Sequence, residues 1–258
     1  MGSPIAVFGS INMDLVIYSD TKPEEGETIF GNSFETFQGG KGANQAVAIS
    51  RLGGEVTFIG KIGNDIFGEQ LKESLVNEGV NIDFLYEHEG PSGIAFINVF
   101  EATSQNQIIV VSGANSQLTS DQVSDELLKS VQILVSQLEA PTDEIEKVFL
   151  RAKEQGCFRI LNTAPSIEIN KELVSLTDLF IMNESELENY SKTKIQADDK
   201  TSILKAIENL SLRDDQSVVV TLGSHGVYIH SKDSQIFVEG HKVDAVDSTG
   251  SGDCFVGA

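Results

Sequence analysis

Residues 247–258, which read DSTGSGDCFVGA, place the carboxylate of Asp253 between small residues and an apolar run typical of a helix. The first N–H groups of a helix lack partners within it, so with the helix dipole they form an anion site. In one interpretation Asp253 takes a proton from a substrate hydroxyl while these N–H groups hold a phosphoryl group. In the alternative, Asp253 only complements the dipole of a glycine-rich turn, and short glycine motifs recur by chance.

A second glycine-rich stretch, residues 39–46, reads GGKGANQA and leads into an expected helix that continues through Leu52. Glycines let a backbone approach a ligand closely, and Lys41 and Asn44 add donors. The stretch is not a Walker P-loop, because Glu35 stands where that motif needs glycine and Gly42 where it needs Ser or Thr. The alternative is an exposed lysine beside a helix cap.

Asn12 and Asp14 follow a short apolar strand at residues 5–8. Residues two apart in an extended segment point to the same face, so these two side chains could together hydrogen-bond the vicinal hydroxyl groups of a ligand. A turn with local side-chain hydrogen bonds is the alternative.

Strands and helices must alternate to position these groups. We expect strands at 5–8, 56–60, 82–86, 132–137, 158–161, 178–182 and 217–221, a hairpin at 227–230 and 235–238, and helices at 67–78, 120–128, 142–154 and 200–210. Thr119 or Ser120 would cap the second of these helices. This rhythm predicts an α/β fold in which a mostly parallel sheet is covered by helices.

Further strand-like runs interrupt the rhythm within residues 11–37 and 93–112. They lie at 15–18, 27–30, 33–37, 94–100 and 107–111. We expect them to form a small separate sheet that acts as a lid. Because a small isolated sheet leaves an apolar face uncovered, we expect it to pair with a second copy in a homodimer.

Polar residues and a glycine recur where the predicted strands end: Glu139, Asn162, Asn183, Glu186, Thr221 and Gly223. Ligands of open α/β sheets bind at the carboxyl ends of the strands. Together these residues suit a nucleotide and metal site, with Glu186 holding Mg²⁺ through water. Each one alone could be a cap or turn residue, and the four histidines show no metal-ligand spacing.

Composition narrows the classes of function. The chain has 258 residues and a net charge of −21, which argues against nonspecific binding to nucleic acid or anionic membranes. Cys157 and Cys254 give no disulfide framework, and no run approaches the roughly 18 apolar residues of a membrane span. Because the N-terminus also lacks a secretory pattern, we expect a single cytoplasmic domain.

The two glycine-rich stretches together resemble the two signatures of the ribokinase family of PfkB-type sugar kinases, and the order of features from Gly9 onward fits along nearly the whole chain. The resemblance implies a three-layer α/β/α sandwich with a β-sheet lid. It implies transfer of the γ-phosphoryl of ATP to O5 of D-ribose, with Mg²⁺ and K⁺ as cofactors.

The resemblance also implies roles for matching positions. Asp253 would be the general base, and Gly250, Ser251 and Gly252 the anion hole. The sugar would contact Asn12, Asp14, Gly39, Gly40, Lys41, Asn44, Glu139 and Asp253. The nucleotide would contact Asn183, Thr221, Gly223, Ser224, Gly226 and Gly252, Glu186 would serve Mg²⁺, and Asp247 and Thr249 would hold K⁺.

Members of this family typically continue well past this motif, so we expect a truncated chain that lacks part of the adenine pocket. Cys254, where relatives commonly carry Thr or Ala, is either a reactive thiol or a packing residue. The alternatives for function are a kinase of the same fold acting on another sugar or nucleoside, and a fragment that binds sugar or nucleotide without turnover. A dinucleotide-binding dehydrogenase would need a third glycine where Phe255 stands.

Overall fold

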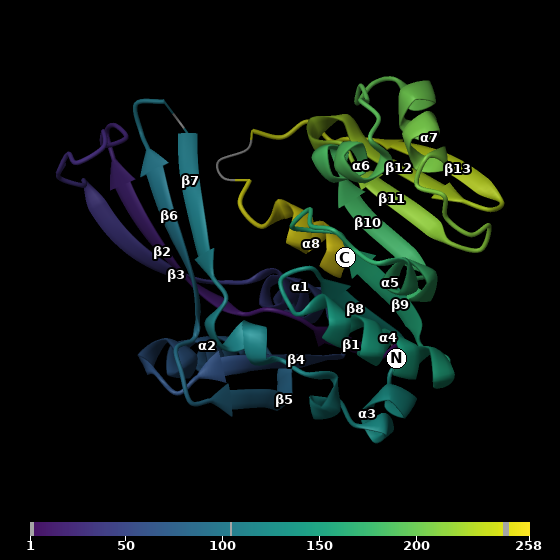
Figure 1. Ribbon diagram of the computed structural model, residues 1–258, viewed down its shortest axis with the longest axis horizontal. Coiled ribbons are helices and arrows are strands. Elements are labelled where there is room, and N and C mark those ends of the chain that lie inside the picture. Colours follow the sequence, from purple (N-terminus) through teal and green to yellow (C-terminus); the bar gives the residue numbers. More distant parts are fainter. Residues whose placement is uncertain (1–2, 104, 245–247) are drawn as a thin grey trace.

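The computed structural model describes residues 3–103, 105–244 and 248–258. It contains a large sheet with the order β13-β12-β11-β10-β9-β8-β1-β4-β5 and a four-stranded sheet with the order β3-β2-β6-β7. Figure 1 shows the small sheet projecting to one side of the large one, with the last helix, α8, between them in that view. This is the predicted division into an α/β body and a lid.

Parallel strands make up most of the large sheet. Its strands are β1 (Ile5–Phe8), β4 (Val56–Gly63), β5 (Asn81–His88), β8 (Ile133–Gln137), β9 (Phe158–Asn162), β10 (Leu179–Asn183), β11 (Ser217–Thr221), β12 (Gly226–Ser231) and β13 (Ser234–Glu239). From β5 across to β11 every pairing is parallel, and β12 and β13 form an antiparallel hairpin at one edge. The carboxyl ends of the parallel strands therefore meet at one edge.

Helices cover both faces of the sheet, because side chains alternate along each strand. The helices are α1 (Lys41–Arg51), α2 (Ile66–Asn77), α3 (Asp125–Ser130), α4 (Thr142–Glu154), α5 (Lys171–Leu176), α6 (Glu184–Ser191), α7 (Lys200–Glu208) and α8 (Ser251–Gly257). In β1, Ala6 and Phe8 join a core with α3 to α7, whereas Val7 joins a core with α1 and α2. Two cores on one sheet make the predicted three-layer sandwich.

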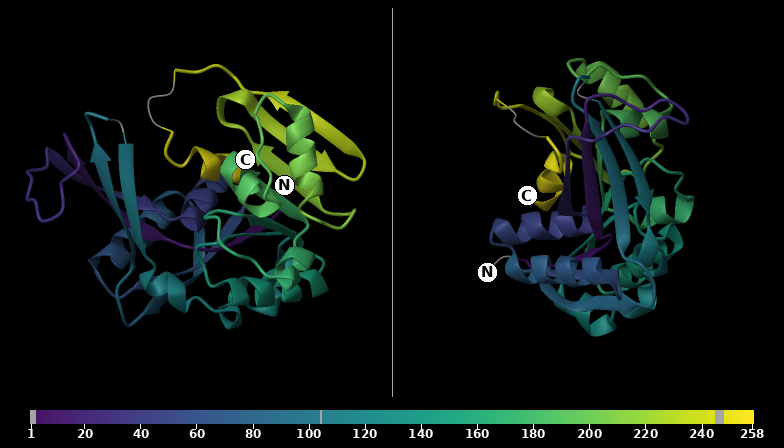
Figure 2. Two further views of the ribbon diagram at one scale, coloured as in Figure 1. Left: turned by 45° about the horizontal axis from the view of Figure 1, so that its top comes forward. Right: turned by 90° about the vertical axis from the view of Figure 1, so that its left-hand side faces the viewer.

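The lid consists of β2 (Asn12–Ser19), β3 (Ser33–Gly39), β6 (Gly93–Phe100) and β7 (Gln105–Val111), and Figure 2 shows it from two further sides. Asn12 pairs with both Gly39 and Gly93, so the base of the lid lies where the sugar-binding residues were expected. The strand predicted at 27–30 is wrong. Phe30 is 97% exposed there, and without a neighbouring strand its β-type composition does not suffice.

One predicted helix needs correction, and two helices of the structure, α5 and α6, were not predicted. The helix predicted at 120–128 is a single 3₁₀ turn, Ser120–Gln122, followed by α3, because Thr119 caps the turn and Ser124 caps α3 separately. No element was predicted directly after the strand at 178–182, where residues 184–191 form α6, which starts with a capping box between Asn183 and Glu186.

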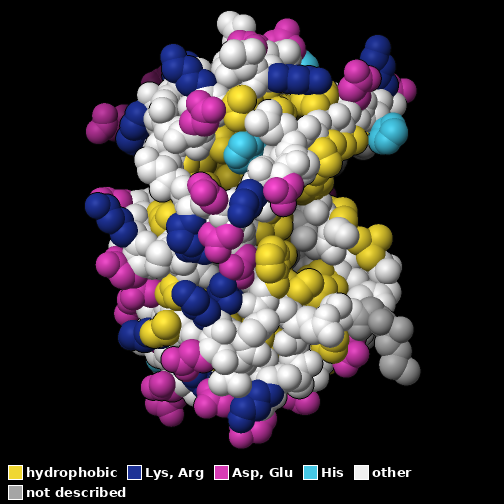
Figure 3. Space-filling model, turned by 90° about the vertical axis from the view of Figure 1, so that its right-hand side faces the viewer, with side chains coloured by type: hydrophobic (Ala, Val, Ile, Leu, Met, Phe, Trp, Pro, Cys, Tyr) yellow, Lys and Arg dark blue, Asp and Glu magenta, His cyan; other side chains and the backbone are white. Residues whose placement is uncertain are grey.

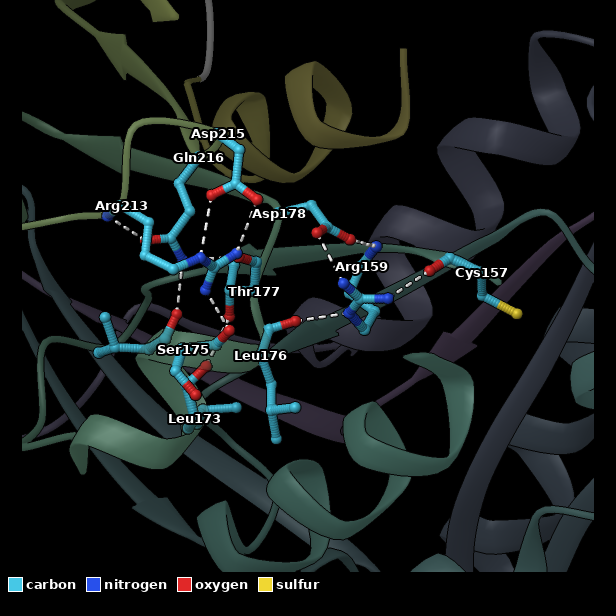
Figure 4. Close-up of polar contacts among 11 residues, drawn as sticks. Cys157, Arg159, Leu173, Ser175, Leu176, Thr177, Asp178, Arg213, Asp215 and Gln216 are labelled. Carbon is cyan, nitrogen blue, oxygen red and sulfur yellow. Dashed lines mark hydrogen bonds and ion pairs between the residues drawn. The ribbon is translucent and has the colours of Figure 1, made fainter. Parts of the chain in front are cut away.

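Buried polar contacts hold the amino-terminal edge of the sheet, opposite the predicted site (Figure 4). The Arg159 guanidinium pairs with Asp178 at 2.6 Å and donates to the carbonyls of Cys157 and Leu176. Gln216 donates to the carbonyls of Val174 and Thr177 at 2.6 and 2.7 Å. The carbonyls of Val174, Leu176 and Thr177 lie at the end of α5, where a helix leaves carbonyl groups without partners of its own.

Figure 3 shows Lys and Arg interspersed with Asp and Glu on one side of the molecule, so the net negative charge is not gathered into a single-sign patch on that face. Among the described residues, no helix is long and apolar enough to cross a membrane.

Candidate active site

Asp253 lies at the junction of the two glycine-rich stretches, although 208 residues separate it from its partner Gln45. It is 8% exposed in the first turn of α8. Asn44 donates to one of its carboxylate oxygens and Gln45 to the other, both at 3.0 Å. The two motifs singled out in the sequence therefore form one site, with both oxygens of Asp253 fixed from α1.

The glycines of residues 39–42 are required by close packing against the segment between β1 and β2. An added Cβ at Gly42 would lie 2.8 Å from the backbone of Gly9, and one at Gly40, whose φ is +88°, would lie 2.6 Å from Ile11. At Gly39 it would meet the carboxylate of Asp14 at 2.4 Å. These contacts bring the start of α1 directly against the predicted sugar-binding residues.

Glu139, after β8, anchors that start of α1. One of its carboxylate oxygens accepts from the Ser10 hydroxyl at 2.6 Å and from the Lys41 backbone N–H at 3.1 Å. Ser10 also accepts from the Gly42 N–H at 3.4 Å. The structure thus brings Glu139 and Lys41 together and adds Ser10, which the sequence analysis did not assign to the site.

Asp14 is the carboxyl group of this site with the most perturbed pKa. The pKa of Asp14 is raised to about 6, mainly by burial and also by the charges of Glu139 and Asp253, while Lys41 opposes them. The positive charge of Lys41 also lowers the pKa of Glu186, which burial raises overall. Lys41 therefore acts electrostatically on carboxylates at both ends of the site, which an exposed lysine beside a cap would not do.

Asn115 orients Asn12, and sequence reasoning missed it. It is 1% exposed in the 3₁₀ helix Gly113–Gln117, just after the lid strand β7. Its Nδ2 donates to Asn12 Oδ1 at 2.7 Å and to the Ile11 carbonyl at 3.0 Å, and its Oδ1 accepts from the Ile11 N–H. With Oδ1 of Asn12 already accepting, the Asn12 amide keeps its N–H groups for other acceptors. No local pattern marks a contact across 103 residues.

Asn183 is the last residue of β10, which pairs with β9, and Glu186 lies in α6 directly after it. Glu186 is 5% exposed, and its two carboxylate oxygens accept from the Asn183 N–H at 3.0 Å and the Asn183 side chain at 2.9 Å. Thr163, after β9, adds a third donor at 3.3 Å. Glu186 therefore serves as a helix cap in this structure, and the predicted role toward Mg²⁺ must share its oxygens with these bonds.

The loop predicted to hold the nucleotide follows β11, the next strand. Gly223 and Ser224 are exposed, and Thr221 donates weakly to the Met182 carbonyl at 3.5 Å. Gly226 has a φ of +109° and no room for a side chain, since a Cβ would lie 2.0 Å from the Val238 carbonyl. The three segments after β9, β10 and β11 thus lie along one edge of the sheet. Asp253, which contacts α1, lies at the end of this edge that is nearest to β9.

Gly250, Ser251 and Gly252 begin α8, with Gly250 as its cap at a φ of +70°. Ser251 and Gly252 are exposed, and a Cβ on Gly250 or Gly252 would meet nothing within 4 Å. The start of this helix is open to a ligand, but the Ser251 N–H donates to the Ser248 carbonyl at 3.1 Å, so a bound anion would have to share or replace this bond.

Only some of the residues expected to bind cations lie in the part of the chain that the structure describes. Asp247 lies outside the described residues, so the expected K⁺ pair with Thr249 is not tested. Within the part of the chain that the structure describes, no group of three His, Cys, Asp or Glu side chains could hold a metal ion. Glu186 still offers the hard oxygen ligand that Mg²⁺ prefers, and Mg²⁺ commonly uses one or two carboxylates with water and substrate phosphates. The donor set therefore fits Mg²⁺ bound together with a nucleotide.

Comparisons with known proteins agree with this architecture. Residues 3–258 match the model of the pfkB family of carbohydrate kinases. A ribokinase from Haemophilus influenzae is 36% identical over 260 residues, which cover all of this chain and 84% of that protein. A deoxyribokinase from Salmonella typhi is 35% identical, with 98% of this chain and 83% of that protein covered.

Solved structures agree as well. Arabidopsis thaliana ribokinase, in a structure described as complexed with ribose and ATP, superposes with a TM-score of 0.89 at 30% identity and covers all of this chain and 85% of that one. Ribokinase from Thermotoga maritima gives a TM-score of 0.87 at 31% identity, with 100% and 84% covered. The chain therefore belongs to the pfkB family of carbohydrate kinases, which transfer a phosphoryl group from ATP to a sugar.

Proposed function

We propose that this kinase phosphorylates D-ribose at O5 to give D-ribose 5-phosphate. The observation that carries the proposal is the convergence of Asp253 with the glycine-rich start of α1, where Asn44 donates to the Asp253 carboxylate at 3.0 Å. A carboxylate held beside an accessible helix start suits a general base next to a phosphoryl group.

In this mechanism Asp253 accepts the proton of the O5 hydroxyl as O5 attacks the γ-phosphorus of ATP. The bond from that phosphorus to the β–γ bridging oxygen breaks, and ADP leaves. The N–H groups at Gly250, Ser251 and Gly252 hold the transferred phosphoryl oxygens, whose charge develops in the transition state. The protein contributes mainly by positioning the hydroxyl and excluding water, which the lid above Asn12 favours.

Asn12 and Asp14 support a pentose with vicinal hydroxyls. Both lie on β2, two residues apart, and Asn115 fixes the amide of Asn12 so that it can donate. Asp14 can accept from hydroxyl groups when it is ionised. Gly40, Lys41 and Glu139 complete this side of the site.

2-Deoxy-D-ribose is the second candidate, because the deoxyribokinase from Salmonella typhi is nearly as similar to this chain as the ribokinase from Haemophilus influenzae, at 35% against 36% identity. A site that hydrogen-bonds a hydroxyl rejects the analogue lacking it by a large factor. A comparison of the two pentoses under identical conditions therefore separates the candidates.

We infer that ATP lies over the segments after β10 and β11, with Asn183, Thr221, Gly223, Ser224 and Gly226 along its length. Mg²⁺ held by Glu186 through water would neutralise the phosphate charge when bound. K⁺ at Asp247 and the Thr249 carbonyl would stabilise the loop that leads to the anion hole.

The lid supports a homodimer. All seven residues of β7 are exposed, and Ile108 and Ile109 expose 56% and 63% of their surface. An exposed apolar patch of this kind favours a second protein surface. Sedimentation should show a dimer for the natural chain and a monomer for Ile109→Asp. A monomeric natural chain at micromolar concentration would refute this part of the proposal.

The test of the function is ADP release with D-ribose, 2-deoxy-D-ribose or no sugar, in the presence of Mg²⁺, K⁺ and ATP. We expect turnover that depends on D-ribose and falls by about 10²–10⁴-fold in Asp253→Asn, the usual contribution of a general base. Cys254→Ala, which changes the exposed neighbour of Asp253, is the matched control and should keep its rate. Faster turnover of 2-deoxy-D-ribose would move the assignment to the second candidate.

A further inference from the structure

Behind Asp253 lies a chain of three buried amide side chains that no step of the reaction uses. Gln45 in α1 and Gln137 at the end of β8 are fully buried, and Asn162 at the end of β9 is 7% exposed. Gln45 Nε2 donates to Asp253 Oδ1 and to Asn162 Oδ1, both at 3.0 Å. Gln137 Nε2 donates to Gln45 Oε1 at 2.6 Å. The chain connects Asp253 to the carboxyl ends of two central strands.

The direction of every bond in this chain follows from Asp253. An ionised carboxylate only accepts hydrogen bonds, so Gln45 must turn its NH₂ group toward it. The carbonyl oxygen of Gln45 then faces Gln137, which must donate a hydrogen bond to it from its own NH₂ group. Each amide has one orientation, and the orientation is fixed by the charge at the start of the chain.

The final acceptor in this series of hydrogen bonds has no donor. Gln137 Oε1 is buried and has no hydrogen-bond partner among the described residues. A buried acceptor without a donor costs about 1–3 kcal/mol, and the reversed amide would lose the bond to Gln45 instead. Gly9 makes the space for this oxygen, because a Cβ there would lie 2.1 Å from it. The fold thus tolerates an unpaired group in order to keep the NH₂ group of Gln45 on Asp253.

We propose that Gln45 is a positioning residue for the catalytic base, held in orientation by Gln137 and Asn162. It fixes Asp253 Oδ1 so that Oδ2, beside Asn44, points to the substrate hydroxyl. Gln45 itself touches no substrate, because its three bonds go to protein groups that lie behind the carboxylate. The inference rests on the proposed role of Asp253 as general base.

The test is Gln45→Met, which keeps the length and volume of the side chain and removes all three bonds. We expect kcat with the pentose that the natural chain prefers to fall by about 10–100-fold, since small misplacements of reacting groups have effects of this size. The dissociation constant of that pentose, measured by calorimetry, should stay within threefold because Gln45 does not touch the sugar. A purely structural residue would change stability without this separation of kcat from binding.

Gln216→Met is the matched control. Gln216 is also buried, also donates twice through Nε2 and also accepts once, from the Arg213 N–H, but it lies at the opposite edge of the sheet. It should lower the melting temperature by a similar amount and leave kcat within twofold. If Gln45→Met and Gln216→Met reduce kcat equally, the positioning role is wrong.

Gln137→Met provides the second variant, and it decides the matter if Gln45→Met does not fold. It removes the orienting donor without touching Asp253, and we expect a smaller loss of kcat, about 3–10-fold, with unchanged pentose binding. Unchanged kcat in this variant would overturn the inference. If the natural chain turns over no pentose at all, the proposed function itself fails, which is distinguishable from the failure of the variants alone.

Discussion

The surroundings of Asp14 in the folded protein disfavour the ionised form of its carboxyl group. Burial raises the pKa of Asp14 to about 6, with the negative charges of Glu139 and Asp253 acting in the same direction. Lys41 offsets only part of this effect. An ionised Asp14 therefore lowers the stability of the folded protein, and the change Asp14→Asn tests this effect.

The sign follows from proton binding. Between about pH 4 and pH 6 the folded state holds a proton on Asp14 that the unfolded chain has released, so stability falls as pH rises through this window. Above pH 6 the full cost is present. The difference between about 6 in the fold and about 3.9 in an unfolded chain corresponds to at most about 3 kcal/mol. Asp14→Asn should raise the free energy of unfolding by up to that amount at pH 8 and by almost nothing near pH 4.

The same ionisation should control sugar binding. If D-ribose needs the charged carboxylate, a pKa of about 6 leaves about nine-tenths of the protein competent at pH 7 and about one-tenth at pH 5. The dissociation constant measured by calorimetry should therefore rise about tenfold over this range. Asp14→Asn should bind D-ribose weakly at both pH values.

Urea denaturation at pH 4 and pH 8, with Asp83→Asn as an exposed control, measures the stability effect. The control should stay within about 0.5 kcal/mol of the natural chain, as surface changes usually do. An Asp14→Asn variant that is no more stable than the natural chain at pH 8 would refute the electrostatic reasoning. Equal ribose affinity at pH 5 and pH 7 in folded protein would refute the contact with an ionised Asp14.

Three further predictions follow from single contacts. Arg159→Met should lower the free energy of unfolding by about 1–3 kcal/mol, because it removes the ion pair with the half-buried Asp178 and the donors to the carbonyls of Cys157 and Leu176, whereas Arg213→Met breaks a surface pair worth at most about 1 kcal/mol; a larger loss for Arg213→Met in urea denaturation would contradict this. Gly42→Ala should abolish turnover and reduce the yield of soluble protein, because its Cβ would lie 2.8 Å from backbone atoms, and an active variant would show that the adjoining loop can move. Asn115→Ala should raise the KM for D-ribose about tenfold, the effect of a lost buried hydrogen bond, with little change in kcat; an unchanged KM would mean that Asn12 does not need its partner.

Local sequence patterns predicted most elements of the fold. The helix expected at 142–154 and the strand at 217–221 have the predicted bounds, because alternation in strands and a 3.6-residue period in helices are visible over short windows. The same windows failed at 27–30, where strand-like residues find no partner, and at 120–128, where two capping residues divide one predicted helix into two elements. At 27–30 the lack of a neighbouring strand, and at 120–128 the two caps, decided the local structure against what residue composition alone predicts.

The two glycine-rich stretches, the carboxylate of Asp253 and the edge of the sheet at which they meet could be predicted from the sequence, because the parallel strands of an α/β chain have their carboxyl ends at one edge. The tertiary structure alone decided which groups surround them. Gln45 meets Asp253 across 208 residues and Asn115 meets Asn12 across 103. Such partners leave no periodic signal, since a hydrogen bond depends on distance and direction in space and not on separation along the chain.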